Sequence, residues 1–462
     1  MSNANQSTQL VETVPQLARE KGRQGCSPAT FAARREEFLR RLGRGGAILR
    51  SAPTTIRSND SDYRYRQDSD FYYLTGLEEP DSVCLLLPEH PEHKFVLFVR
   101  PRNPERETWD GLRVGPEAAC ARFGADAAYS IEQLDELLPK YLEKVEIIHY
   151  RFGRDRNFDE KIFDLLKHFR LLRQRTGEGP CSITDIAEIL HEMRLYKNPE
   201  EVMLMQRAAD IAAQAHIAAM RTLRPGMYEF EIEAILEHHF RRGGARAPAY
   251  TSIVGAGRNA TILHYNENNQ QILDGELLLV DAGAEYEYYC SDITRTYPAN
   301  GRFTPPQREI YEIVLAAQLA AIAQVAPGVR FVDVHQCALN VLVEGLLRLG
   351  LLSGEKEQVI EEGLYRKFYM HRTSHWLGVD VHDVGKYQIG GESRRFQAGM
   401  VLTVEPGIYI GELPDVPAQY HNIGVRIEDD ILVTEEGREV LTARAPKEIA
   451  ELESLIGQGG FA

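Results

Sequence analysis

Apolar and polar positions along the chain follow two different spacings, and the spacing separates predicted helices from predicted strands. Residues 27–43 have apolar side chains at helical intervals, and Ser27 followed by Pro28 is typical of the start of a helix. Short apolar runs bounded by Gly, Pro or charged residues then predict strands at 46–52, 71–77, 82–88 and 94–101. Helical spacing returns at 130–144 and 158–174. The first part of the chain therefore predicts an α/β fold.

The segment 173–182 is polar and contains Gly and Pro, which is typical of a linker. We therefore expect a disordered tail over residues 1–27, an N-terminal α/β domain over 28–180 and a C-terminal domain over 181–462. A chain of 462 residues fits this division, because single hydrophobic cores rarely grow beyond about 250–300 residues.

The second part of the chain contains a weak internal repeat. It opens with a long helix that is predicted to begin at Asn198, with Pro and Glu at the positions of a capped first turn. Residues 223–244 resemble 325–350, because each segment has a Pro-Gly turn and then an amphipathic helix that ends at Gly. Residues 276–283 resemble 399–407 as apolar runs that end in an acid and Gly. Either the repeat brings equivalent positions together across a pseudo-twofold axis, or it is a chance similarity between α/β segments.

Charge and cysteine usage narrow the class of protein. The 53 basic and 68 acidic residues give a formal net charge of −15, which argues against a nucleic-acid partner because such proteins usually carry a basic face. No apolar run approaches the roughly 20 residues that cross a bilayer, so we expect no membrane partner. The first ten residues lack a signal-peptide pattern, and the six scattered cysteines contain no C-x-x-C pair. We therefore expect a cytoplasmic protein with reduced thiols.

Four acidic residues occupy matching places in the two repeats. Asp281 ends one apolar run and Asp292 begins the next, while Glu405 and Glu428 have the corresponding places in the second repeat. Facing side chains on neighbouring strands lie about 4.5–5.5 Å apart at Cβ, so these acids would repel one another unless cations lay between them. Asp is also a common turn residue, and on that alternative the four acids are not neighbours at all.

Four histidines stand at the ends of short apolar segments in the same half of the chain: His264, His371, His375 and His382. A single histidine is more often a packing residue than a ligand, but four of them near repeated acids favour a metal site. Carboxylates with imidazole suit Mn²⁺, Fe²⁺ or Co²⁺, and bridging carboxylates hold two such ions roughly 3.5–4 Å apart. The pattern therefore predicts a site for two divalent cations.

At these motifs the chain resembles the pita-bread metallopeptidases, and among them the Xaa-Pro aminopeptidases (aminopeptidase P). The resemblance runs from RLYKNPEEV through MHRTSHWLGVDVHDVG to RIEDDILVTEEG, and the segment 57–88 resembles the companion domain of the same family. It implies a two-domain α/β protein, with an N-terminal creatinase-like α/β domain. The C-terminal domain would be a pita-bread α+β domain with a pseudo-twofold internal repeat.

The resemblance also implies a metal-ligand role for five matching residues. Asp281 would chelate one ion, and Asp292 and Glu428 would bridge both ions. His375 and Glu405 would complete the coordination of the second ion, and Mn²⁺ is the expected metal. All five positions have the residue types of the family.

A further set of residues matches the family's shell around the metals, which binds substrate and transition state: His264, His371, His382 and Arg426. Trp109 matches a position that approaches the active site of a neighbouring subunit, unless it is a packing residue of its own domain. Arg372 departs from the family pattern, because many relatives have a small residue there, and a long cation would affect access or the path of the substrate.

The implied activity is release of the N-terminal residue from peptides whose second residue is proline, by a hydroxide that bridges two divalent metal ions. His382 and His264 would stabilise the oxyanion, and Glu405 would carry a proton to the leaving proline nitrogen. Arg426 would orient Glu428. The family also implies a homo-oligomer, either a dimer or a tetramer.

Three alternatives remain open. A prolidase shares the architecture and the metals but cleaves only Xaa-Pro dipeptides. A non-catalytic pita-bread module that binds peptides would have lost metal ligands, whereas the five positions here are Asp, Asp, His, Glu and Glu. A creatine-type amidinohydrolase shares the fold, but its metal-free chemistry does not require this set of acids.

Overall fold

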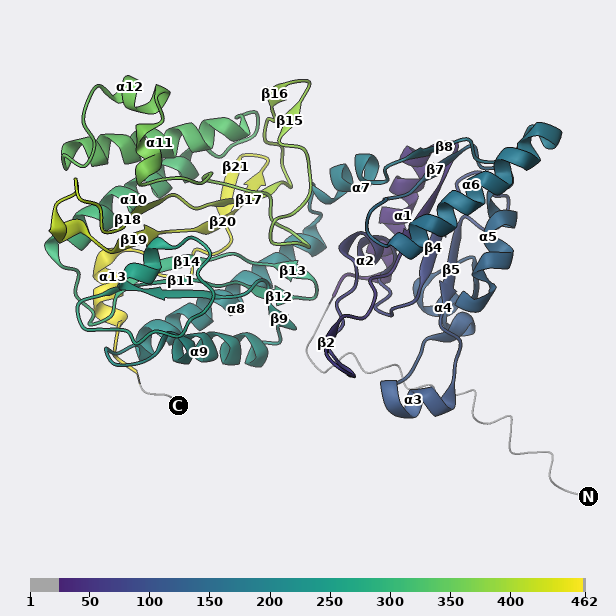
Figure 1. Cartoon of the computed structure of the whole chain (residues 1–462), viewed down its shortest axis with the longest axis horizontal. Helices are drawn as coiled ribbons and strands as arrows, with labels where there is room; N and C mark the ends of the chain where they lie inside the picture. Colours follow the sequence, from purple (N-terminus) through teal and green to yellow (C-terminus); the bar gives the residue numbers. More distant parts are fainter. Residues whose placement is uncertain (1–24, 460–462) are drawn as a thin grey trace, which may run out of the picture. The chain divides into compact units, whose positions relative to one another are not determined.

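The computed structural model describes residues 25–459, so the tail predicted at 1–27 lies almost entirely outside the described residues. The chain divides into two compact units, Cys26–Arg194 and Leu195–Ala462 (Figure 1). The first unit includes the segments β8 (Ser182–Thr184) and α7 (Ala187–Arg194), which follow the boundary expected after residue 180. Strand β8 pairs with β7, and this pairing attaches the segment to the first unit.

The first unit is built around a six-stranded mixed sheet in the order β6–β5–β4–β1–β7–β8. The remaining strands of that sheet are β1 (Gly45–Arg50), β4 (Val83–Leu86), β5 (Phe95–Val99), β6 (Ala127–Ser130) and β7 (Ile147–His149). Strand β4 pairs antiparallel with β1 and β5, whereas the outer pairs β5–β6, β1–β7 and β7–β8 are parallel. A separate hairpin joins β2 (Ile56–Ser58) and β3 (Ser61–Asp62).

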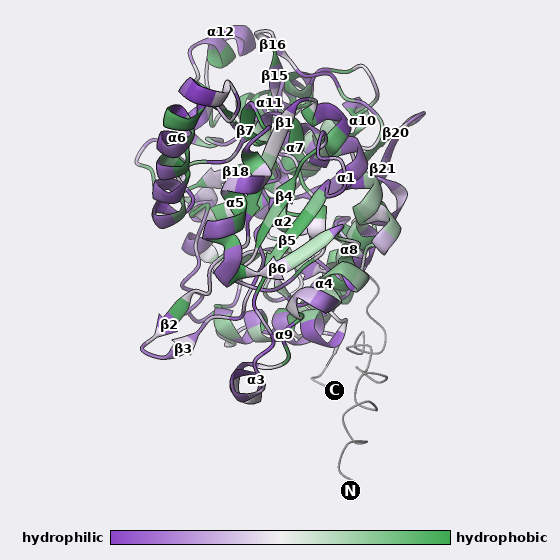
Figure 2. Cartoon of the chain, turned by 90° about the vertical axis from the view of Figure 1, so that its right-hand side faces the viewer, coloured by the Kyte–Doolittle hydropathy of each residue, from purple (hydrophilic) through white to green (hydrophobic). Residues whose placement is uncertain are grey.

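The helices of the first unit are α1 (Pro28–Leu42), α2 (Ser69–Thr75), α3 (Pro104–Asp110), α4 (Gly115–Phe123), α5 (Leu134–Leu142), α6 (Arg156–Thr176) and α7. Ser27 caps α1 as predicted, because its side chain accepts a hydrogen bond from the Thr30 backbone N–H. Figure 2 shows β4 and β5 as hydrophobic segments, and α6 with hydrophilic and hydrophobic residues alternating along it. The core between them includes Ile48, Phe98 and Phe169.

The strand predicted at 71–77 is wrong, because most of these residues lie in helix α2. Every residue of α2 is buried, and its N-terminus is capped by Asp68, which accepts from the Phe71 backbone N–H. A short helix that is buried on all sides gives the same continuous apolar run as a buried strand. The runs at 46–52, 82–88 and 94–101 do contain the strands β1, β4 and β5.

The second unit has two helix pairs around a set of small sheets. Its helices are α8 (Pro199–Thr222), α9 (Glu229–Arg242), α10 (Pro305–Gln324), α11 (Phe331–Arg348), α12 (Lys356–Glu361) and α13 (Ile449–Leu455). Asn198 caps α8 as predicted, and its side chain and that of Glu201 accept each other's backbone N–H. In Figure 1, α8 and α9 lie on one side of the strands, and α10 and α11 lie on the other.

The sheets of the second unit are short and follow the same division. Their strands are β9 (Ala247–Pro248), β10 (Ile253–Ala256), β11 (Leu277–Asp281), β12 (Ala284–Tyr286), β13 (Tyr289–Cys290), β14 (Thr294–Pro298), β15 (Gln388–Ile389), β16 (Glu392–Ser393), β17 (Val401–Val404), β18 (Gly407–Ile410), β19 (Ile423–Arg426), β20 (Asp429–Thr434) and β21 (Gly437–Val440). The sheet β10–β11–β14 follows the pair α8/α9, and the sheet β17–β20–β21 follows the pair α10/α11. Each half thus supplies a helix pair and then strands that lead to the acids.

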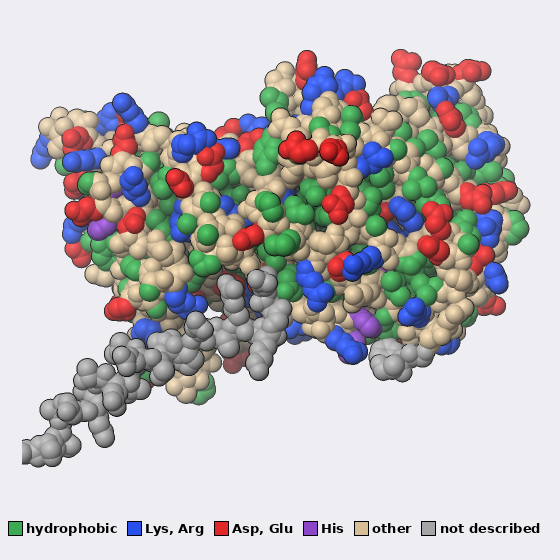
Figure 3. Space-filling view, turned by 180° about the vertical axis from the view of Figure 1, so that it is seen from behind, with side chains coloured by type: hydrophobic (Ala, Val, Ile, Leu, Met, Phe, Trp, Pro, Cys, Tyr) green, Lys and Arg blue, Asp and Glu red, His purple; other side chains and the backbone are tan. Residues whose placement is uncertain are grey.

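Surface features agree with the charge and cysteine patterns. None of the six cysteines, all of which lie within residues 25–459, forms a disulfide. Figure 3 shows Lys and Arg interspersed with Asp and Glu on the face that it displays, which differs from the single-sign face of a nucleic-acid-binding protein. None of the described helices combines the length and the apolar character that crossing a bilayer requires.

Candidate metal centre

The two aspartates are brought together by a close approach of backbone segments. Asp281 is the last residue of β11 and lies opposite Thr294 of β14, and Asp292 stands just before β14. A Cβ atom at Gly283 would lie 1.8 Å from the carbonyl oxygen of Ser291. Any side chain at 283 would therefore separate the two segments, and the D-A-G sequence is what allows Asp281 and Asp292 to converge.

The second half brings the other three acid and histidine groups to the same place. Glu405 follows β17, and its backbone N–H donates to the Thr373 carbonyl at 2.8 Å. The Thr403 N–H donates to the His375 carbonyl at 2.9 Å, so the histidine segment lies along β17. Glu428 lies between β19 and β20, and its N–H donates to a carbonyl at the start of β14 at 3.1 Å. This last bond joins the two halves at the site.

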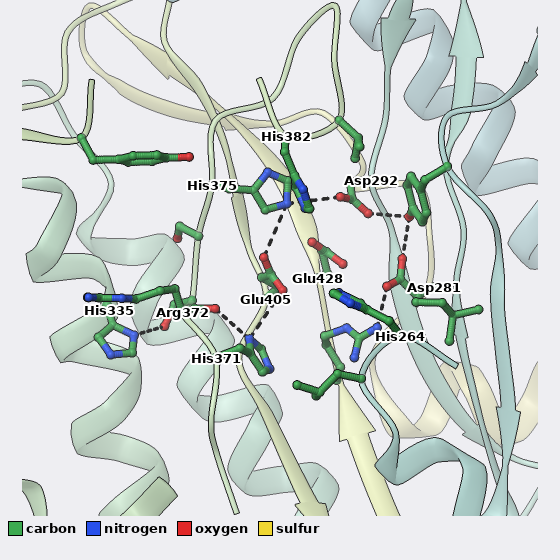
Figure 4. Close-up of a pocket in the computed structure, with 18 of the residues that line it drawn as sticks. His264, Asp281, Asp292, His335, His371, Arg372, His375, His382, Glu405 and Glu428 are labelled. Carbon is green, nitrogen blue, oxygen red and sulfur yellow. Dashed lines mark hydrogen bonds and ion pairs between the residues drawn. The ribbon is translucent and has the colours of Figure 1, made fainter. Parts of the chain in front are cut away.

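The five predicted ligands line one cavity of about 830 Å³, and their side chains point toward one another (Figure 4). His375 Nε2 lies 3.4 Å from Asp292 Oδ2 and 3.5 Å from Glu405 Oε1. Ligand atoms of Asp292, His375 and Glu428 all lie within 4.8 Å of one another. The alternative in which the acids are merely separate turn residues is therefore wrong.

Burial shifts the protonation of this cluster strongly. It raises the pKa of Glu405 to about 7, and it raises the pKa of Glu428 well above the usual range, with Asp292 adding to the effect. Burial also raises the pKa of Asp281, against the opposing charge of Arg426. Burial alone would lower the pKa of His375, but the hydrogen bond to Asp292 and the charge of Glu405 raise it to about 9.

The donor set fits divalent cations. Four carboxylates and one imidazole supply mostly oxygen ligands without thiolates, which suits Mn²⁺, Fe²⁺ or Co²⁺. One guanidinium, that of Arg426, does not neutralise three buried carboxylates and the half-buried Glu405, whereas divalent charge would return their pKa values toward the ionised state. The site therefore has the donor set of a protein that binds divalent metal.

Arg426 hydrogen-bonds to one proposed metal ligand and is linked to a second. Its Nη2 donates to Asp281 Oδ2 at 2.5 Å, and its Nε donates to Thr294 Oγ1 at 3.1 Å. The Thr294 hydroxyl in turn donates to Glu428 Oε2 at 2.6 Å. Arg426 thus hydrogen-bonds to Asp281 directly and is connected to Glu428 through the Thr294 hydroxyl, and its charge opposes the raised pKa of Glu428.

A hydrogen-bond chain fixes the tautomer of His371. Arg426 Nη1 lies 3.0 Å from the Tyr409 hydroxyl, which lies 2.8 Å from His371 Nε2. His371 Nδ1 lies 2.8 Å from the Arg372 carbonyl oxygen, which only accepts, so Nδ1 carries the proton and Nε2 accepts from Tyr409. Burial and the charge of Arg426 lower the pKa of His371 to about 3, so the ring is neutral.

Of the remaining residues predicted to bind substrate, two histidines line the cavity and Trp109 lies in the first unit. His264 and His382 are exposed and line the same cavity, and the His382 ring stands edge-on to that of His375 with centroids 4.4 Å apart. Trp109 lies in α3 of the first unit and is 84 % exposed, so the alternative that it packs within its own domain does not fit.

Sequence reasoning missed the tyrosines of the site. The Tyr250 hydroxyl lies within hydrogen-bond distance of one carboxylate oxygen each of Asp281 and Asp292, and its single proton serves one of them at a time. Tyr409 links Arg426 to the neutral histidine as described. Neither tyrosine stands in a spacing that marks a ligand, and tertiary packing brings Tyr250 to the aspartates and Tyr409 to Arg426 and His371.

Comparisons with known proteins identify the family of the chain. The model of metallopeptidase family M24 matches residues 203–435, and the model of the aminopeptidase P N-terminal domain matches residues 31–149. The chain belongs to metallopeptidase family M24. It combines an N-terminal α/β domain with a C-terminal pita-bread domain that carries a pseudo-twofold internal repeat, as predicted.

Individual relatives extend the likeness over nearly the whole chain. The Xaa-Pro aminopeptidase of Escherichia coli is 42% identical over 92% of this chain and 97% of its own length. The Xaa-Pro aminopeptidase of Haemophilus influenzae is 45% identical over 92% of this chain and 96% of its own length. The solved structure of Pseudomonas aeruginosa aminopeptidase PepP has a TM-score of 0.90 and 48% identity, and the match covers 93% of this chain and 98% of that one.

Proposed function

We propose that the protein is a metal-dependent aminopeptidase that releases the N-terminal residue from peptides with proline at the second position. The observation that carries the proposal is the convergence of Asp281, Asp292, His375, Glu405 and Glu428 in one cavity large enough for a short peptide. The relatives named Xaa-Pro aminopeptidase support the same substrate class.

Those five residues are our proposed ligands for two divalent ions, with Mn²⁺ as the expected metal. When bound, two such ions would supply a nucleophilic water that is deprotonated at neutral pH, and they would polarise the scissile carbonyl. Buried carboxylates that bridge are the groups that hold two ions close together, and Asp292 and Glu428 lie where they can do so.

Glu405 is suited to move a proton. Burial raises its pKa to about 7 in the metal-free protein; the charge of the proposed ions would favour its ionised form, which can accept a proton. Its Oε2 lies 3.7 Å from His371 Nδ1, and the neutral ring has the fixed tautomer described above. We assign Glu405 to carry the proton to the leaving proline nitrogen, and His371 to position the substrate beside it.

The exposed histidines of the cavity are placed for binding rather than for structure. Among residues 25–459, no side chain or backbone group hydrogen-bonds to the rings of His264 or His382, so both are available to a substrate carbonyl or oxyanion. Burial, together with the charge of His375, lowers the pKa of His382, which favours a neutral ring that donates one hydrogen bond.

Proline selection has a physical basis in the substrate. An X-Pro bond has no N–H and a restricted φ, so enzymes that hold an extended, hydrogen-bonded substrate bind it poorly. Apolar residues such as Ile253, Leu263 and Phe331 line the cavity and can contact the proline ring. We further propose that the exposed Trp109 contacts substrate in a neighbouring subunit of a homo-oligomer. The cytoplasmic location stays a prediction from the sequence.

The test is a substrate panel with the protein reconstituted separately with Mn²⁺, Co²⁺ and Zn²⁺. We expect cleavage of Ala-Pro-Ala and longer Xaa-Pro peptides, and no cleavage of Ala-Ala-Ala. Cleavage of Ala-Pro alone would assign a prolidase instead. Absence of cleavage with every metal, in protein that binds the metal, would refute the peptidase proposal.

A further inference from the structure

One cation in the cavity is not used by the proposed chemistry. Arg372 lies between the two histidines of the H-R-T-S-H segment and lines the same cavity as the metal ligands. Its side chain is exposed. Within the part of the chain that the structure describes, no group hydrogen-bonds to its guanidinium or forms an ion pair with it. The contrast is Arg426, which is buried and fully engaged by Asp281 and its neighbours.

The direction of Arg372 separates it from the carboxylates. Figure 4 shows its side chain extending toward His335, away from the cluster that contains Asp292 and Glu428. Burial and then the charge of Arg372 lower the pKa of His335 to about 4, which agrees with this proximity. Arg372 therefore does not neutralise the metal ligands, and its positive charge faces open cavity.

The backbone on both sides of Arg372 is held firmly. The Thr373 hydroxyl lies 2.8 Å from His335 Nδ1 and 2.6 Å from the Tyr369 hydroxyl, and Thr373 is buried. The Arg372 carbonyl is held by His371. The position from which the side chain extends is therefore fixed, and the planar guanidinium loses less freedom per hydrogen bond to a carboxylate than a lysine would.

The peptide substrate carries negatively charged groups beyond the bond that is cleaved. In the proposed reaction the amino end of the peptide lies at the metal ligands, so the rest of the peptide extends away from them. The third residue follows the first by two positions, which span at most about 7 Å. Arg372 lines the same cavity as the metal ligands, on the side of His335. A peptide whose amino end is held at the ligands can therefore extend its third residue into the space that the guanidinium faces.

We propose that Arg372 is a specificity-determining residue that binds a carboxylate on the third residue of the substrate. This carboxylate is either the α-carboxylate of a tripeptide Xaa-Pro-Yaa or the side chain of an acidic third residue in a longer peptide. The inference rests on the proposed function and narrows it to peptides with a negative charge at that place. A dipeptide Xaa-Pro has no third residue and gains nothing from Arg372.

Steady-state kinetics with matched substrates test the proposal. One pair is Ala-Pro-Ala and its C-terminal amide, and the other is Ala-Pro-Asp-Ala-amide and Ala-Pro-Asn-Ala-amide. If Arg372 binds the α-carboxylate, we expect the wild-type KM to be about tenfold lower for Ala-Pro-Ala than for its amide. If Arg372 binds an acidic side chain, we expect the same difference between the Asp and Asn peptides. In each case the guanidinium and the carboxylate form two charge-assisted hydrogen bonds. The first pair reports the α-carboxylate, and the second reports an acidic side chain.

Variants assign the effect to Arg372. Arg372→Gln should raise KM for the charged substrate to that of its neutral partner, with kcat and the KM of the neutral partner changed less than about twofold. Arg372→Lys should keep part of the preference, because it keeps the charge but not the fork. Arg366→Gln, at an exposed arginine outside the cavity, is the matched control and should keep the full preference. The preference should also shrink as salt rises.

Equilibrium binding separates this inference from the proposed function. The dipeptide Pro-Ala should bind the metal-free protein more tightly than its amide in calorimetry, and Arg372→Gln should remove the difference. Failure of every Xaa-Pro peptide to react would overturn the proposed function, and calorimetry would still decide on Arg372. Equal KM and affinity for charged and neutral partners in the wild type, or equal losses for both in Arg372→Gln, would overturn the role of Arg372.

Discussion

Metal binding to this cluster should release protons, and the number follows from the structure. In the metal-free protein at pH 7, a pKa of about 9 keeps His375 protonated, and burial raises the pKa of Glu428 well above its usual range. A pKa of about 7 leaves Glu405 about half protonated. Ligands must be deprotonated to bind a metal, so loading the site should displace at least about one proton per chain, the one on His375, and a further fraction from Glu405.

Calorimetry measures this number directly. Metal is titrated into chelator-treated protein at pH 7 in several buffers with different enthalpies of ionisation, and the slope of observed enthalpy against ionisation enthalpy gives the protons released. The apparent affinity should also rise with pH by the same number of decades per unit. Glu361→Gln, at an exposed acid in α12, is the matched control and should leave the slope unchanged. A slope below one proton per chain would contradict the prediction that the metal-free ligands carry protons at pH 7.

Three further predictions concern stability and the hydrogen-bond chain. The pKa values of Glu405 and His375 are higher in the folded metal-free protein than in the unfolded chain, so their contribution to the free energy of unfolding is present at low pH and is lost as pH rises through about 7 and 9. Differential scanning fluorimetry should therefore show the melting temperature of the chelator-treated protein falling from pH 6 to 8. A divalent ion at 100 times its Kd should raise the free energy of unfolding by about 2.7 kcal/mol. Asp70→Asn should lower the free energy of unfolding in urea by about 3 kcal/mol, because it removes the buried carboxylate that pairs with Arg194 at 2.6 Å, and an unchanged midpoint would contradict that role. Tyr409→Phe should lower kcat about tenfold with metal content unchanged, because it removes the hydroxyl that links the guanidinium to the neutral imidazole, and wild-type kcat would remove this chain from the mechanism.

Short sequence motifs predicted those features of the fold that depend on only a few neighbouring residues. The caps at Ser27 and Asn198 depend on the residue type and on one turn of helix, and both are confirmed. The strand predicted at 71–77 failed because burial on all sides removes the periodicity that distinguishes a helix from a strand. The pairing of β8 with β7 was invisible, because a three-residue exposed strand has no apolar signature.

The residues of the site likewise fall into those marked by a sequence pattern and those brought in by tertiary packing. The acids and histidines were found because they recur in a repeat and in a histidine-rich motif, and these signals survive in a linear sequence. Tyr250 was missed because residues 250 and 281 meet only when β10 pairs with β11. The contact of Arg426 with Asp281, rather than with its neighbour in sequence Glu428, likewise depends on how the two halves pack.

The central claim is that five side chains from the two halves of the second unit hold a pair of divalent ions. The most direct test is metal analysis of wild-type protein and Asp292→Ala after equilibrium dialysis against Mn²⁺, with circular dichroism to verify the fold. We expect about two ions per chain in the wild type. The variant should hold at most one ion, with the wild-type spectrum and no measurable turnover. Two ions and full turnover in Asp292→Ala would contradict the claim.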